Sequence, residues 1–223
     1  ETVGEFVDLF SAVGWTQSAV TTGATVVVRP NQLNAPYENV EVRRAMLEAV
    51  DLSVVLELGM NGQGTVGENH HVCPIHPEYA ALPPMVVDKA AAQARLAAAG
   101  HADHNFTLVS LDDGLGRFTC DAIAAQMRDA GMTVTREVLP GSTFWNDWLN
   151  YPFSATEWNH RELGVQILNL AYRSGVAWNE TAFSNTEFDS LLDQANGIQD
   201  ADARRVVMAR LQQIMQEEAV SII

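Results

Sequence analysis

Residues 31–46, NQLNAPYENVEVRRAM, restrict the possible folds of this chain more than any other segment, because an extended, proline-containing stretch runs directly into an amphipathic helix. Pro36 cannot donate a backbone hydrogen bond and biases Ala35 towards extended geometry, whereas Asn39 can cap the helix that follows. The apolar residues on one side of that helix are Val42, Ala45, Met46, Ala49 and Val50. A strand-like run at residues 24–28 precedes the block. We therefore expect a strand, a proline-bent crossing and a helix with one buried stripe.

The composition argues against negatively charged partners. The 223 residues carry a formal net charge of −15, whereas binding to nucleic acids or anionic membranes needs clustered Lys and Arg. No apolar run approaches the roughly 20 residues that span a bilayer, and no basic segment followed by an apolar one opens the chain. We expect a globular protein with no nucleic-acid partner and no direct membrane insertion.

Helices and strands alternate along the chain. Periodicity and composition predict helices over residues 5–13, 51–60, 88–99, 116–130 and 142–149. Two further helical stretches follow near the C-terminal end, and Asp200 can cap the second of them. In the helix over residues 116–130, Phe118, Ile123 and Met127 are expected to face inwards. Residues 61–87 lack periodicity and are rich in Gly, Pro and His, which predicts a long surface loop.

The predicted strands, after the first, are residues 106–111, 133–139 and 153–158. The strand, helix, strand order between residues 106 and 139 has the spacing of two parallel strands joined by a crossover helix. No Gly/Ser linker divides the chain, so residues 24–223 are expected to form a single domain, preceded by a helix and loop at residues 1–23. The predicted fold class is α/β, a mixed, mostly parallel sheet with flanking helices.

The block at residues 31–46 resembles the hinge-and-helix signature of bacterial extracytoplasmic solute-binding proteins of family 5, the peptide, nickel and opine receptors of ABC importers. The matching positions are Asn31, Pro36, Tyr37, Glu38, Asn39, Val40, Val42, Arg43 and Ala45. Further segments resemble family features in the family's order, at residues 56–66, 88–100, 106–111, 123–135, 183–192 and 200–218. The resemblance implies a type II periplasmic-binding-protein-like lobe. Because family members have two lobes, and the return of the chain to the first lobe is missing here, it also implies the second lobe alone.

The resemblance implies the substrate-binding component of an ABC importer, and not an enzyme. Such a protein captures a peptide-like or other small polar ligand reversibly and delivers it to the permease subunits in the membrane. We expect it in the periplasm, or attached to the outer cell surface, as a monomer without a cofactor.

In the family, a strand that ends in a Trp leads into a loop that faces the ligand and, in peptide receptors, carries acidic residues. The corresponding segment here contains Arg and Glu but no Asp, which departs from the usual peptide-binding version. We expect the planar Arg161 guanidinium to bind a ligand carboxylate or phosphate while Trp158 packs on the ligand's apolar part. The alternative is a surface pair between Arg161 and Glu162 beside a core Trp. The predicted ligand-binding residues are Trp158, Asn159, His160, Arg161, Glu162 and Trp178.

Three other readings remain. Residues 62–67 spell GxGxxG, but a helix precedes them and no helix follows, so a glycine-rich turn is favoured over a dinucleotide site. A metal could draw on soft ligands from the cluster of His70, His71, Cys73 and His76, although the spacing fits no zinc or copper template. Either would indicate a metal- or nucleotide-dependent enzyme, and a non-binding isolated lobe is the third reading. Cys73 and Cys120 are either a single bridge or, as we favour, two separate small residues.

Overall fold

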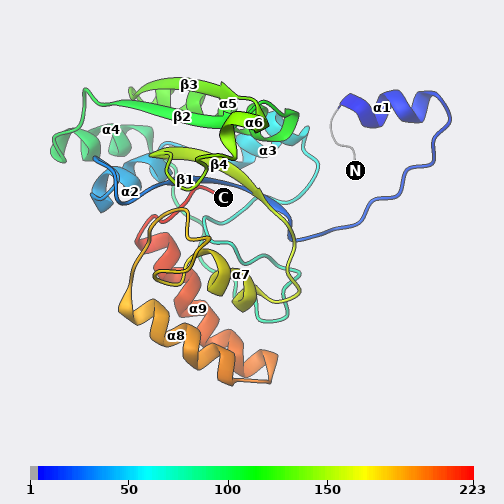
Figure 1. The fold of residues 1–223 in the computed structure, drawn as a ribbon, viewed down its shortest axis with the longest axis vertical. Coiled ribbons are helices and arrows are strands. Elements are labelled where there is room, and N and C mark those ends of the chain that lie inside the picture. The colour runs from blue at the N-terminus through cyan, green and yellow to red at the C-terminus, as the bar shows by residue number, and fades with distance from the viewer. Residues whose placement is uncertain (1–4) are drawn as a thin grey trace.

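A four-stranded sheet forms the centre of the molecule in the computed structural model, which describes residues 5–223 (Figure 1). Its strands are β1 (Thr25–Pro30), β2 (Asn105–Leu111), β3 (Thr133–Leu139) and β4 (Phe153–Trp158). They lie in the order β1-β4-β2-β3, in which β2 pairs in parallel with both β3 and β4, and β1 runs antiparallel to β4. The predicted mixed, mostly parallel sheet is confirmed, with two of its strands at the predicted residues.

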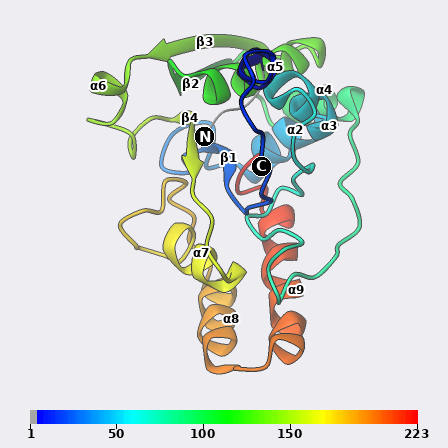
Figure 2. The same cartoon turned by 90° about the vertical axis from the view of Figure 1, so that its right-hand side faces the viewer.

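Helices cover the sheet in two groups. The first group is α2 (Val40–Glu48), α3 (Leu52–Met60), α4 (Lys89–Ala98) and α5 (Gly114–Asp129). The second is α7 (Gly164–Ala171), α8 (Thr186–Gly197) and α9 (Ala201–Glu217), and Figure 2 shows α8 and α9 lying side by side below the sheet. Two smaller elements complete the order: α1 (Glu5–Ala12), which stands apart from the sheet in Figure 1, and the single turn α6 (Gly141–Phe144). In the part of the chain that the structure describes, none of the helices has the length and apolar character needed to cross a membrane.

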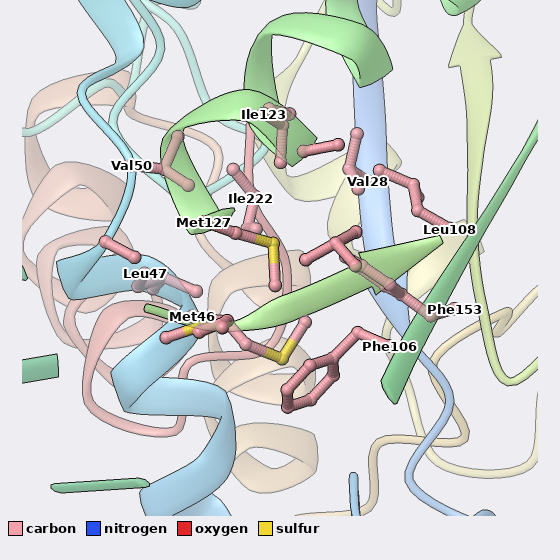
Figure 3. Close-up of a cluster of buried hydrophobic side chains, with 14 of the residues drawn as sticks. Val28, Met46, Leu47, Val50, Phe106, Leu108, Ile123, Met127, Phe153 and Ile222 are labelled. Atoms are coloured by element: carbon pink, nitrogen blue, oxygen red, sulfur yellow. The ribbon is translucent and has the colours of Figure 1, made fainter. Parts of the chain in front are cut away.

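The apolar residues form two cores, one on each face of β1. Successive side chains of a strand point to opposite faces of the sheet, so neighbouring residues of β1 belong to different cores. Val28 belongs to the first core, with Phe106, Met46 and Met127 around it (Figure 3). Its neighbour Val27 belongs to the second core, which lies between the sheet and helices α7, α8 and α9. Each core holds side chains that are fully buried, so β1 forms a wall common to both.

The apolar end of the chain also joins β1. The backbone N–H of Val28 donates to the carbonyl oxygen of Ile222 at 2.9 Å, and the N–H of Ile222 donates back at 2.8 Å. Ile222 is buried in the first core (Figure 3). This antiparallel bridge places the apolar residues 219–223 beside the sheet.

Arg43 explains why the segment over residues 31–46 folds as it does. Asn39 caps α2 by accepting a hydrogen bond from the Glu41 N–H at 2.9 Å, as expected, and the Ala35–Pro36 peptide bond before it is cis. Arg43 is only 2% exposed, and its Nη1 donates to the Tyr37 carbonyl at 2.8 Å. Its Nε and Nη2 donate to the Glu218 carbonyl at 3.1 and 2.9 Å. The guanidinium thus ties the proline turn to the end of α9.

Three local expectations are wrong. Residues 61–87 are irregular, but they are not all at the surface, because six residues between 69 and 78 are buried: Asn69, His70, His71, Val72, His76 and Glu78. Phe118 does not face inwards and is 50% exposed, whereas Ile123 and Met127 are buried as expected. The helix expected over residues 142–149 shortens to the single turn α6. Helix α7 was not anticipated, because no polar cap marks its start.

Candidate ligand-binding site at the carboxyl ends of the strands

Strands β2, β3 and β4 are parallel, so their carboxyl ends share one edge of the sheet. The chain leaves β2 for α5, which packs in the first core, and leaves β4 for α7, which packs in the second. Neighbouring strands whose connections diverge in this way mark a topological switch point, where open α/β sheets bind their ligands. Residues 159–163, directly after β4, lie at this point.

Two Trp side chains meet beside this loop. Trp158, the last residue of β4, is only 7% exposed, while Trp178 is 47% exposed. Their ring centroids are 6.0 Å apart and the rings are T-shaped, with an interplanar angle of 69°. Trp158 therefore acts as the floor of an aromatic pair in which Trp178 presents the accessible indole surface.

Arg161 folds back over its own loop. Its Nη1 donates to the carbonyl oxygens of Asn159 at 3.1 Å and His160 at 3.0 Å. Within the described residues it forms no ion pair with Glu162, whose Oε1 lies 3.9 Å from His160 Nε2. Arg161 as a whole is half-buried, and a ligand oxygen that met its guanidinium would complete an existing set of hydrogen bonds.

A buried ion pair lies behind the two Trp rings. Arg29 Nε and Glu180 Oε2 are 2.5 Å apart, and their side chains are 2% and 4% exposed. The Thr156 hydroxyl donates to the two Glu180 oxygens at 3.0 and 2.8 Å, and Arg29 Nη2 donates to the Trp148 carbonyl at 2.8 Å. Burial raises the pKa of Glu180, and the charge of Arg29 and hydrogen bonds from the Thr156 and Trp158 side chains oppose the shift. Glu180 therefore connects β1, β4 and the segment that carries Trp178.

Comparison with protein families identifies the relationship. The model of the bacterial extracellular solute-binding proteins, family 5 Middle, matches residues 7–166. The chain belongs to this family. A comparison with curated protein sequences finds no match.

Solved structures of other binding proteins share the fold of this family-5 chain. The oligopeptide-binding protein AppA from Bacillus subtilis, in complex with a nonapeptide, has a TM-score of 0.80 and 17% identity over 96% of this chain and 47% of its own. The periplasmic binding protein DppA from Helicobacter pylori, in complex with the peptide STSA, has a TM-score of 0.80 and 16% identity over 99% and 46%. AgaA from A. tumefaciens R10, in complex with agropinic acid, has a TM-score of 0.79 and 19% identity over 91% and 43%. The fold is that of a type II periplasmic binding protein, and the chain spans about half the length of these proteins.

The histidines of the family-5 chain at residues 70–76 each have separate partners. His71 Nδ1 lies 3.1 Å from the Tyr172 hydroxyl, and His70 Nε2 lies 3.2 Å from Gln212 Nε2 and 3.0 Å from Glu68 Oε2. Burial lowers the pKa of His71 to about 3, so this ring is neutral at ordinary pH. Within the described residues, no three His, Cys, Asp or Glu side chains form a group that could hold a metal ion.

The structure also decides between the alternatives for the glycine-rich residues 62–67 and for the two cysteines. Residues 62–67 follow α3 and continue into irregular backbone, so the strand and helix that a dinucleotide fingerprint requires are not beside them. Cys73 and Cys120 are both free thiols, the first half-buried and the second buried in the first core, where burial raises its pKa to about 12. The two are separate residues and do not form a bridge.

A solvent-open recess lies next to the candidate loop. It encloses about 470 Å³ of space between protein atoms, part of it open to solvent. Its wall combines the start of β1, residues 65–68 and the histidine segment, with Gly23, Glu68, His70, His71 and Cys73 among its lining residues. The recess places polar and soft side chains beside the segment that enters the sheet.

Sequence reasoning placed residues 158–162 and Trp178 in the candidate site, and the structure brings Trp158 and Trp178 into contact. It missed Arg29 and Glu180, and it considered His76 only as a possible metal ligand and not as a neighbour of this loop. Arg29 offered one signal, since a charge directly after a β-branched run in a strand needs a buried partner. His76 offered none, because its contact with residue 161 depends on the tertiary fold.

Proposed function

We propose that this family-5 chain supplies one wall of the ligand cleft of an ABC-importer receptor, which captures a peptide-like or other small polar ligand and delivers it to a permease. The observation that carries the proposal is the position of residues 158–162 and Trp178 at the switch point of a family-5 fold. The related AppA and DppA structures contain peptides, and that of AgaA contains agropinic acid. Binding of this kind is reversible and needs no cofactor and no bond-breaking chemistry, so the protein acts as a receptor and not as an enzyme.

Within this proposal residues 24–223 form the second lobe, and residues 1–23 lead into it. The ligand lies against Trp178, with Trp158 beneath, and its acidic group meets Arg161. Asn159, His160 and Glu162 offer further polar contacts from the same loop. A cleft with only one wall lacks the exclusion of water and the converging contacts that give high affinity. The receptor acts as a monomer in the periplasm or at the outer cell surface.

Thermal-shift measurements test the proposed function. The 223-residue chain, and any longer product of the same gene, are screened against peptides of two to nine residues, opines, sugars, Ni²⁺ and Zn²⁺. A ligand that binds only the native state raises the unfolding temperature. Stabilisation by a peptide, opine or sugar supports the receptor. Stabilisation by metal ions alone, or a longer product that no compound of any class stabilises, contradicts it.

Replacement of Arg161 by alanine should weaken binding of the best acidic ligand from this screen. A hydrogen bond to a charged group contributes about 1.5–3 kcal/mol, so the dissociation constant should rise by roughly 10- to 100-fold. Isothermal titration calorimetry measures this change. Arg128→Ala is the matched control, since the Arg128 side chain also donates to a main-chain carbonyl, that of Val134, but lies at the opposite end of the strands. Equal affinities of Arg161→Ala and the wild type would exclude the proposed role.

Replacement of Trp178 by alanine should remove the exposed aromatic surface of the site. An aromatic contact contributes about 0.5–1.5 kcal/mol beyond the area it buries, so we expect the dissociation constant to rise roughly tenfold for a ligand with an apolar side chain. Trp15→Ala serves as the control, because Trp15 is also exposed but lies before β1. If both variants bind the ligand alike, Trp178 does not contact it.

A further inference from the structure

Two imidazole rings from distant parts of the chain stack beside the candidate ligand loop. His76 belongs to the irregular segment after α3, and His160 lies in the loop after β4. Their ring centroids are 5.9 Å apart and their planes differ by 5°. His76 is 3% exposed, and the His160 side chain is 30% exposed. The stack is therefore a contact between a buried ring and a ring of the loop itself.

The hydrogen bonds of His76 assign its proton. The backbone N–H of Cys73 donates to His76 Nδ1 at 2.9 Å, so this nitrogen carries no hydrogen. Nε2 then carries the proton and donates to the carbonyl oxygen of Arg161 at 3.0 Å. In a doubly protonated ring, the Nδ1–H would point at the Cys73 N–H, and two donors cannot form a hydrogen bond with each other. The arrangement thus requires a neutral imidazole.

His160 contacts the backbone just before β1. Its Nδ1 accepts a hydrogen bond from the backbone N–H of Gly23 at 3.0 Å, just before β1 begins. A Cβ atom at position 23 would lie 2.9 Å from this nitrogen, 3.1 Å from Cys73 Sγ and 3.4 Å from His76 Nε2. Only a glycine lets these three side chains approach the backbone so closely. The loop after β4 is thereby fixed against the entry of the chain into the sheet.

Burial favours the neutral form of His76, and the charged and titratable groups around it act in both directions. Burial lowers its pKa; the hydrogen bond to the Arg161 carbonyl and the buried Glu78 carboxylate oppose that shift, and His160 adds to it. Cys73 Sγ lies 3.4 Å from Nδ1, and the neutral His71 is nearby on the same segment. Glu162 lies beyond His160, 3.9 Å from its Nε2. The Arg161 side chain is occupied by the carbonyl oxygens of its own loop.

We infer that His76 is a positioning residue, which holds residues 159–162 in place at the carboxyl edge and does so only as a neutral imidazole. The inference rests on the proposed function only in treating that loop as ligand-binding. Because the pKa of His76 is lowered in the folded chain, its contribution is complete above the ordinary histidine pKa of 6.5 and is lost as the pH falls from that value through the lowered pKa of the folded state. The loop should then move away from Gly23 and from the segment that carries His76.

Two variants separate the hydrogen bond from the charge. In His76→Gln the terminal amide lies where Nε2 lies and can still donate to the Arg161 carbonyl, but it does not titrate. In His76→Asn the shorter side chain can still accept from the Cys73 N–H but does not reach the loop. His104→Asn is the control, because burial also lowers the pKa of His104. This ring lies in a different part of the fold, where its centroid is 4.7 Å from that of Phe106.

The readout is the amide spectrum of the ¹⁵N-labelled chain between pH 8 and pH 4 without ligand, together with the ring signals of His76. We expect the amide signals of Gly23 and residues 159–162 to move with the His76 ring in the wild type and in His104→Asn. The component of these shifts that coincides with the titration of the His76 ring should be absent in His76→Gln, and the signals should be displaced at every pH in His76→Asn. The inference is overturned if these signals in His76→Asn overlay those of the wild type, or if the component that coincides with the wild-type His76 ring titration persists in His76→Gln.

The wild-type titration and His76→Gln decide the matter even if His76→Asn does not fold. If the loop signals titrate with the His76 ring but the protein binds none of the screened ligands, the proposed function is refuted and the positioning role stands. If the protein binds a ligand but the loop signals do not depend on His76, only the positioning role is refuted.

Discussion

Replacement of Glu180 by alanine should destabilise the fold by about 3–5 kcal/mol, because it leaves the Arg29 guanidinium charged and without a carboxylate in a buried position. The variant also removes the acceptor of the Thr156 hydroxyl. Urea denaturation, followed by Trp fluorescence, measures the free energy of unfolding. A loss below about 1 kcal/mol would show that the pair does not behave as a buried ion pair.

Two comparisons interpret that result. Asp193→Ala removes the carboxylate from an exposed pair with Arg173, at 2.8 Å, and should change stability little. The double replacement Arg29→Met with Glu180→Met removes both charges and should cost less than Glu180→Ala, since apolar pairs often substitute for buried ion pairs without loss. If the double variant were the less stable, the cost would come from packing and not from the stranded charge.

Replacement of Arg43 by alanine should cost roughly 3 kcal/mol, because several charge-assisted hydrogen bonds disappear and the carbonyls of Tyr37 and Glu218 lose their buried donor. Lysine cannot restore them, because a single ammonium group cannot replace the planar guanidinium, which donates to the Tyr37 and Glu218 carbonyls at the same time. Arg44 provides a matched control on the same helix, since it is more exposed and contacts the neighbouring Glu217 carbonyl. Chemical denaturation should therefore separate Arg43→Ala from Arg44→Ala. Equal losses would mean that Arg43 has no special role in the proline turn.

The sequence predicted those parts of the fold that depend on local chemistry. The side-chain oxygens of Asn39 and Asp200 accept hydrogen bonds from backbone N–H groups two and three residues further along the chain, respectively. Helix caps of this kind can be recognised from the local sequence alone. Strands β3 and β4 have the predicted bounds because turn residues flank their β-branched or aromatic runs. Strand β1 extends to Pro30, beyond the predicted residues 24–28, because its pairing with Phe153 continues past the apolar run.

The parts that could not be predicted depend on contacts between distant residues. Residues 69–80 have loop composition, yet several of them are buried, and Gln212 on α9 holds the Ala80 backbone through its amide, accepting at 3.0 Å and donating at 2.6 Å. Phe118 was expected to face inwards, but it lies on the face of α5 opposite to the buried Met127, whereas Gly116 and Thr119 on either side of it are buried. Of the candidate site, the residues on one loop were predicted and their supports, Glu180 and His76, were not, because each comes from another segment.

The position of β1 between two cores has a consequence for how the chain folds. Its partners, β4 and Ile222, come from the middle and the end of the sequence, so β1 can dock only after long loops have closed. Native contacts between such distant residues slow folding, whereas α8 and α9, which are adjacent in sequence, can pair early. Neither apolar core is complete until β1 arrives. We therefore expect the docking of β1 to complete both cores together and to bring Gly23 against the loop after β4.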